Sequence, residues 1–181
     1  DVAVHLGTLL ALLIYFRRQL GTMATSWIDS VLRRQHTRDS RLAWQILVAT
    51  VPVGLVGLLF DDYIEAHLRN PLFVAGTLTV FGLLMYAADR YGRGNKDEYS
   101  LGWPQVIAIG CAQALALMPG TSRSGITMTA GRALGLSRSG AARFSFLLAI
   151  PGIGAAGAYE GLKLVTSTEP VDWQPMVVGV V

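Results

Sequence analysis

The segment with the clearest chemical potential is Met118-Pro-Gly-Thr-Ser-Arg-Ser-Gly-Ile-Thr127, which lies within an otherwise apolar stretch. Pro119 and Gly120 predict a break in the incoming helix, and Ser122 or Ser124 can cap the helix that follows. The first turn of a new helix presents free N–H groups and the positive end of its dipole. The segment therefore predicts a binding site for an oxyanion.

Arg123 supplies positive charge at this break. Its planar guanidinium matches two phosphate oxygens at once, and Ser122, Ser124 and Thr127 add hydroxyl donors. An arginine inside a bilayer costs about 2.5 to 3.5 kcal/mol on insertion scales, and an anionic ligand would offset that cost. The alternative is that Arg123 reaches a membrane interface while the hydroxyl groups only cap a helix.

The composition indicates a membrane protein. The 181 residues are 52% hydrophobic and 15% charged, with a mean hydropathy of +0.44, whereas soluble domains carry about 25% charged residues. The apolar content excludes intrinsic disorder, and the single Cys111 excludes a disulfide scaffold. We expect an all-α, polytopic membrane helix bundle in which residues 1–181 form one domain, truncated at both ends, with a broken or re-entrant helix at Pro119–Thr127.

The net charge of +3 does not indicate a nucleic-acid partner. Six arginines crowd the polar segment 17–41, between two apolar runs, where such clusters usually report membrane topology. Only Trp27 lies among them, whereas a stacking surface for bases needs several aromatic residues. We therefore expect no nucleic acid among the partners.

Charge-free runs mark the candidate membrane helices. A helix needs about 20 residues to cross the hydrocarbon core, and the middle three of five runs are long enough. The runs are Val2–Phe16, Leu42–Phe60, Asn70–Ala88, Tyr99–Ser122 and Phe144–Tyr159.

The polar connections predict the topology. The first three connections, 17–41, 61–69 and 89–98, carry six, one and three Lys or Arg residues. The first and third are therefore expected in the cytoplasm and the second outside. The stretch that follows would then lie outside despite its four arginines, Arg123, Arg132, Arg138 and Arg143. Either this stretch re-enters the membrane, which is the interpretation we favour, or the simple count fails there.

A short amphipathic stretch precedes the second run. Trp27, Ile28, Val31 and Leu32 share one face at helical spacing, with arginines close behind. This pattern predicts a short helix on the membrane surface, and a solvated loop is the alternative.

Around the break, the sequence resembles a known family. Ala114-Leu-Ala-Leu-Met-Pro-Gly-Thr-Ser-Arg-Ser-Gly-Ile-Thr127 is similar to the Pro-Gly-x-Ser-Arg-Ser-Gly-x-Thr motif of undecaprenyl-diphosphate phosphatases, the bacitracin-resistance proteins of bacteria. The resemblance continues through Gly135-Leu-Ser-Arg-Ser139 and Ala142–Pro151. It also covers the opening Asp1–Ala11 and Tyr15-Phe-Arg-Arg18, so the landmarks extend along nearly the whole chain.

The resemblance implies a multi-pass enzyme of the bacterial plasma (inner) membrane. It would hydrolyse undecaprenyl diphosphate to undecaprenyl phosphate and inorganic phosphate, which recycles the lipid carrier for cell-wall synthesis. The family's catalytic arginine and hydroxyl groups transfer to Arg123, Ser122, Ser124 and Thr127. Substrate binding is assigned to Arg123 together with Gly120, Gly125 and Gln113, since Gln113 lies on the approach helix. The implied partners are a polyprenyl diphosphate lipid and the membrane, and a homodimer is an assembly that this interpretation allows.

Other family features are missing or changed. The resemblance implies a divalent cation, Mg²⁺ or Ca²⁺, held by a glutamate-rich motif, and a Ser/His pair for attack and proton transfer. These motifs should lie upstream of Asp1, so we expect residues 1–181 alone to bind substrate without turning it over. Position 143 is Arg where many members carry Glu, so the sequence does not support an acidic role there.

Several single residues have a structural explanation as their first interpretation. His5 most simply bonds a neighbouring helix, Glu160 pairs with Lys163 along a helix, and Cys111 is a small buried residue. Ser145 is expected to form a helix–helix hydrogen bond, and Gln113 would otherwise do the same.

Two other functions compete with hydrolysis. A membrane transporter or flippase of an anionic lipid also builds its site from broken helices. An inert structural membrane protein would leave Arg123 unexplained.

Overall fold

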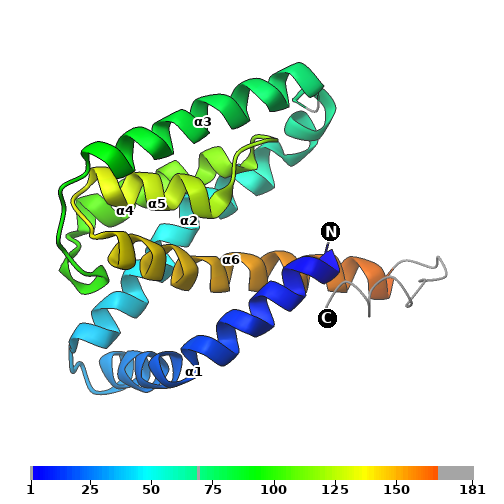
Figure 1. Ribbon diagram of the computed structural model, residues 1–181. Helices are drawn as coiled ribbons and strands as arrows, with labels where there is room; N and C mark the ends of the chain where they lie inside the picture. The colour runs from blue at the N-terminus through cyan, green and yellow to red at the C-terminus, as the bar shows by residue number, and fades with distance from the viewer. Residues whose placement is uncertain (1, 69, 167–181) are drawn as a thin grey trace.

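The computed structural model describes residues 2–68 and 70–166, and describes the backbone alone for 2–6, 61–67, 156 and 158–166. Throughout these ranges the chain is all-helical, as the sequence predicted, and Figure 1 shows the long helices as separate rods. The α-helices are α1 (Val2–Leu32), α2 (Arg38–His67), α3 (Pro71–Tyr91), α4 (Trp103–Ala114), α5 (Arg123–Ala133) and α6 (Arg138–Thr166). Two short 3₁₀ turns, η1 (Glu98–Ser100) and η2 (Leu115–Leu117), flank α4.

The stretch predicted as a short surface helix is helical, but it forms the last turns of α1 and is not a helix of its own, and its place on a membrane surface stays a prediction. The chain stays helical from Val2 to Leu32, because no proline interrupts it and the polar stretch after Phe16 carries good helix formers. An ion pair between Asp29 and Arg33 (3.6 Å) closes the last turn. Arg34, with φ of 55°, then ends the helical path. Arg17 and Arg18 therefore lie within α1 and do not mark its end.

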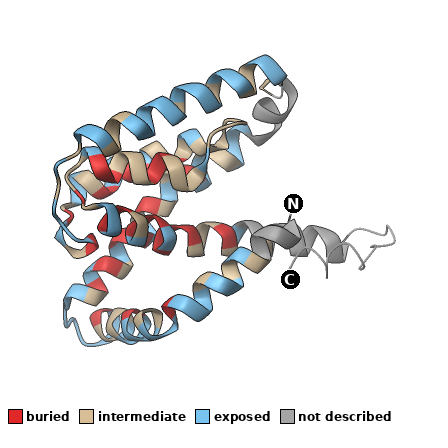
Figure 2. Ribbon diagram, in the orientation of Figure 1, coloured by how far each residue is buried: buried red, intermediate tan, exposed pale blue. Residues whose placement is uncertain are grey.

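Helices α2 and α3 are the two described helices that are long and apolar enough to cross a membrane. The qualifying parts are Arg38–Phe60 and Pro71–Tyr91, with mean hydropathies of 2.0 and 1.7. The predicted run Leu42–Phe60 lies within the first of these and shares its end at Phe60, while the helix itself continues to His67. Helix α3 starts at the edge of the predicted run Asn70–Ala88, where the side chain of Asn70 accepts a hydrogen bond from Leu72 N and Pro71 begins the helix. No side chain of α3 is buried (Figure 2), as expected for a helix that faces lipid.

The predicted span Tyr99–Ser122 is wrong as a single membrane helix. Helix α4 and η2 together cover Trp103–Leu117, and the chain then turns back through α5. Gln105 Nε2, near the start of α4, donates to Leu134 O (3.0 Å) just after α5. The two helices therefore form a hairpin whose open ends lie together (Figure 1). Re-entry of this hairpin into a membrane stays a prediction.

The core lies around α2, which packs against α1, α4 and α6. Its largest fully buried side chains include Leu42, Ile109 and Phe144, one each from α2, α4 and α6. Helices α2 and α4 touch at Gly110, where an added Cβ would come within 2.7 Å of Ala49 O. This close crossing fixes the axis of α4 and, through the hairpin, the position of α5.

Candidate functional site: a broken helix that presents Arg123

The helix break falls where Pro119 and Gly120 predicted it. Helix α4 ends at Ala114, η2 tightens the last turn, and Gly120 takes a φ of +88° that other residues rarely adopt. A Cβ on Gly120 would lie 2.5 Å from Val74 O, so the turn packs directly on α3. Only glycine fits this position, both for its backbone angle and for its contact.

Ser122 starts the second helix. Its Oγ accepts a hydrogen bond from Gly125 N (3.2 Å), and its carbonyl accepts one from Ile126 N (2.9 Å). Of the two serines that the sequence left open, Ser122 is therefore the N-cap of α5. A Cβ on Gly125 would approach Ser122 Cβ to 3.1 Å, so a glycine at 125 leaves room for the cap.

Arg123 is half-buried at this first turn and forms no ion pair with any carboxylate whose side chain the structure describes. Its Nη1 atom is buried without a hydrogen-bond partner among the described residues. The guanidinium packs against Gly152 of α6, where an added Cβ would lie 2.8 Å from Nη1. A buried donor left unpaired costs about 1–3 kcal/mol. This cost in stability falls on Arg123, the residue that the sequence analysis assigns to anion binding.

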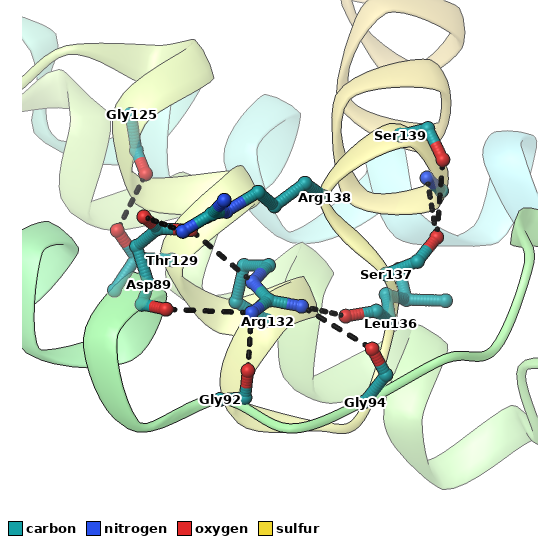
Figure 3. Close-up of polar contacts among 11 residues, drawn as sticks. Asp89, Gly92, Gly94, Gly125, Thr129, Arg132, Leu136, Ser137, Arg138 and Ser139 are labelled. Carbon is teal, nitrogen blue, oxygen red and sulfur yellow. Dashed lines mark hydrogen bonds and ion pairs between the residues drawn. The ribbon is translucent and has the colours of Figure 1, made fainter.

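The three arginines that follow Arg123 are paired, which sets Arg123 apart. Arg138 holds both carboxylate oxygens of Asp89, through Nε at 2.7 Å and Nη2 at 2.8 Å. Arg132 is buried, lies 3.6 Å from the same carboxylate, and donates to backbone carbonyls that include Leu136 O (2.6 Å) and Gly92 O (Figure 3). These two arginines join the loop after α3 to the loop between α5 and α6.

Arg143 has a structural partner as well. Its Nε donates to Glu98 (2.7 Å) and its Nη2 to Gln19 (2.8 Å), so the position carries the positive half of a partly buried ion pair. Tyr99 completes the cluster by accepting from Gln19 and donating to Asp39 (3.0 Å). Burial raises the pKa of the Tyr99 hydroxyl, and the hydrogen bond to Asp39 raises it further. Tyr99 therefore stays a protonated donor at neutral pH.

Thr127 and Ser145 form the helix–helix hydrogen bond expected of Ser145. Their hydroxyl oxygens lie 2.6 Å apart, and the two residues are only 2% and 3% exposed. The Thr127 hydroxyl also lies 2.9 Å from Arg123 O and 3.2 Å from Ser124 O. In this structure Thr127 connects the first turn of α5 to α6, and its catalytic role stays a prediction.

Gln113 and Thr121 are further buried donors near the break. Gln113 is 1% exposed, and neither its Nε2 nor Thr121 Oγ1 has a partner among the described residues. Gln113 lies on the face of α4 that also buries Ile109 and Gly110. Sequence reasoning missed Thr121 and also Thr77 of α3, which donates to Pro119 O. The available sequence signal for Thr77 was its polar side chain within the apolar run 70–88.

The remaining sequence predictions concern Cys111, three side chains that lie outside the described residues, and a metal site. Cys111 is exposed rather than buried, because it lies off the α4 face that packs on α2. The side chains of His5, Glu160 and Lys163 lie outside the described residues. In the part of the chain whose side chains are described, no group of three His, Cys, Asp or Glu could hold a metal ion. These residues therefore do not provide the divalent-cation site that the resemblance implies.

An apolar cavity of about 320 Å³ lies between α1, α2 and α6. Its wall includes Trp27, Ile46 and Pro151. Pro151 immediately precedes Gly152, which contacts Arg123, but successive residues on a helix point about 100° apart. The cavity and the guanidinium therefore lie on different sides of α6.

Fold and site together define an all-helical protein in which a broken helix presents, beside a capped helix start, an arginine that no described carboxylate pairs. The bacitracin resistance protein BacA family matches residues 1–181, and the chain belongs to that family. It is 53% identical over 184 residues to undecaprenyl-diphosphatase 2 of Stutzerimonas stutzeri, and 52% identical over 179 residues to the undecaprenyl-diphosphatase of Nitrosococcus oceani. These alignments cover 100% and 99% of this chain and 68% of each relative.

Proposed function

We propose that the protein hydrolyses undecaprenyl diphosphate to undecaprenyl phosphate and inorganic phosphate. The observation that carries the proposal is the half-buried Arg123, which lacks a carboxylate partner among the described residues while Arg132, Arg138 and Arg143 each have one. A diphosphate head group supplies the missing negative charge. The names of the relatives favour hydrolysis over the transporter or flippase.

The chain's own residues bind and orient the diphosphate. The guanidinium of Arg123 offers a fork of N–H donors that matches two phosphate oxygens. The N-terminus of α5 adds a positive dipole end, and Ser124 adds a hydroxyl. Such fixed donors stabilise charge that develops on phosphoryl oxygens during transfer. In the balanced reaction, water attacks the terminal phosphorus, the bond to the bridging oxygen breaks, and undecaprenyl phosphate leaves.

A divalent cation is part of the proposal, although the described side chains do not provide its ligands. If present, it would neutralise charge on the diphosphate. Binding roles for Gly120, Gly125 and Gln113 are part of the proposal, and the two glycines would take part through their backbone, since the space beside Gly120 is filled by α3 and that beside Gly125 by the Ser122 cap.

We further propose a multi-pass protein of the bacterial inner membrane, with its basic end in the cytoplasm. The loops that join α1 to α2, α3 to α4 and α5 to α6 meet at one end of the bundle, since Arg41 bonds Leu101 O and Ser137 bonds Lys96 O. Most of the chain's Lys and Arg residues lie there, which the positive-inside rule assigns to the cytoplasm. The break packs on the first half of α3, toward the opposite end. The basic residues of these three loops and their flanks are Arg33, Arg34, Arg38, Arg41, Arg90, Arg93, Lys96, Arg132, Arg138 and Arg143.

The direct test is phosphate release from undecaprenyl diphosphate by the purified full-length gene product, with and without a chelator. The proposal expects steady release of one phosphate per lipid, and loss of release when the chelator removes divalent ions. Failure to release phosphate in the presence of added Mg²⁺ and Ca²⁺ would contradict the proposed function.

A further inference from the structure

Helix α3 holds the break from one side through Thr77. The Thr77 hydroxyl lies 2.6 Å from Pro119 O, closer than the carbonyls of its own helix, Phe73 O (3.1 Å) and Val74 O (2.9 Å). A threonine in a helix usually bonds its own preceding turn. Here the single hydroxyl proton of Thr77 is donated to Pro119 O, a carbonyl that has no regular intrahelical partner because the helix is broken there. Thr77 therefore anchors the incoming end of the turn.

Helix α6 holds the break from the other side through Ser145. Its Oγ lies 2.6 Å from Thr127 Oγ1 and 3.4 Å from Ser124 O, within the first turns of α5. Ser145 and Gly152 are seven residues apart, about two helical turns, so they lie on the same face of α6. One residue of that face binds the start of α5, and the other receives the guanidinium of Arg123.

From these two contacts we propose that Thr77 and Ser145 are positioning residues for the diphosphate reaction. Each acts through the backbone of the broken turn or through Thr127, and together they fix the helix start that carries Arg123. The proposal rests on the proposed function. Small errors in placement are costly, because a displacement of about 1 Å at a reacting centre can lower a rate about 100-fold.

The test compares Thr77→Val and Ser145→Ala in the full-length gene product with two matched controls. Thr79→Val removes a hydroxyl of α3 that bonds only its own helix, at Ala75 O (2.7 Å). Ser30→Ala removes a buried serine that accepts a hydrogen bond from Trp44 and so joins α1 to α2, far from the break along the chain. We expect kcat to fall about tenfold or more in the two test variants, with KM changed less than about twofold. The controls should keep wild-type kcat, and Thr77→Ser should restore most of the loss.

A second measurement separates positioning from a general loosening of the fold. In an Arg123→Lys background, Thr77→Val and Ser145→Ala should lower kcat by clearly less than they do in wild type, because residues that act through a shared group are not additive. Wild-type kcat in both test variants, equal losses in the controls, or full additivity with Arg123→Lys would each overturn the inference. Those results leave the proposed function standing, whereas a wild-type protein without phosphate release overturns both.

Discussion

Replacing Arg123 with alanine is expected to abolish catalysis without destabilising the fold. Hydrogen bonds to charged groups contribute about 1.5–3 kcal/mol each, and the guanidinium can make two of them to a diphosphate. The loss is therefore about 3–6 kcal/mol, and with a tenfold change in rate for each 1.4 kcal/mol this lowers kcat/KM at least about 100-fold.

The thermal stability of Arg123→Ala should stay unchanged or rise slightly, although its catalytic rate falls. Alanine removes the buried Nη1 that has no partner, which relieves a cost of about 1–3 kcal/mol. Part of that gain is lost with the contact between the guanidinium and Gly152. We expect an unchanged or slightly higher melting temperature, measured by tryptophan fluorescence in detergent, together with severely reduced phosphate release.

Two further variants sharpen the test. Arg123→Lys keeps the charge without the fork, so it should recover no more than about a tenth of the wild-type rate. Arg93→Ala, at an exposed arginine of the loop after α3, should change neither rate nor stability. Near-wild-type hydrolysis by Arg123→Ala would refute the assignment. A melting temperature lowered by more than about 4 °C, roughly 1 kcal/mol for a chain of this size, would instead make Arg123 a structural residue.

Four other variants follow from the geometry of the site. Arg132→Ala should lower the free energy of unfolding by about 1–3 kcal/mol, because it leaves backbone carbonyls that include Leu136 O and Gly92 O without their donor; unchanged thermal unfolding would contradict this. Gly120→Ala should cost at least about 2 kcal/mol, since φ is +88° and Val74 O blocks a Cβ, and a wild-type melting curve would show that the turn can rearrange. Ser122→Ala should cost about 1 kcal/mol as a lost cap. Ser122→Asp should keep the cap yet stop phosphate release by pairing with Arg123, so an active Ser122→Asp enzyme would count against the anion site.

Short sequence motifs predicted those features of the fold that a few neighbouring residues determine. Pro119 and Gly120 located the break, because one lacks an N–H and the other accepts a positive φ. Asn70 and Pro71 start α3 through chemistry that is equally local, as cap and first residue. Each of these features is decided within a few residues of the chain.

Features that depend on distant contacts could not be predicted in this way. The charge-free run 99–122 predicted one membrane span. In the structure it forms only the first arm and the turn of the hairpin of α4 and α5, which depends on the contacts of Gln105 with Leu134 and of Gly110 with α2. The sequence also could not separate Arg123 from Arg138 or Arg143. Their carboxylate partners lie 49 and 45 residues away along the chain, and only the folded structure shows that Arg123 has no such partner within the described part of the chain.

The most direct measurement is the affinity of the full-length protein for a soluble short-chain prenyl diphosphate, determined by titration calorimetry. The wild type should bind the diphosphate more tightly than the matching monophosphate or alcohol, and Arg123→Ala should lower its affinity about 100-fold while Arg93→Ala leaves it unchanged. Equal affinity of the wild type and Arg123→Ala for the diphosphate would contradict the account, because the unpaired guanidinium would then have no anion to bind.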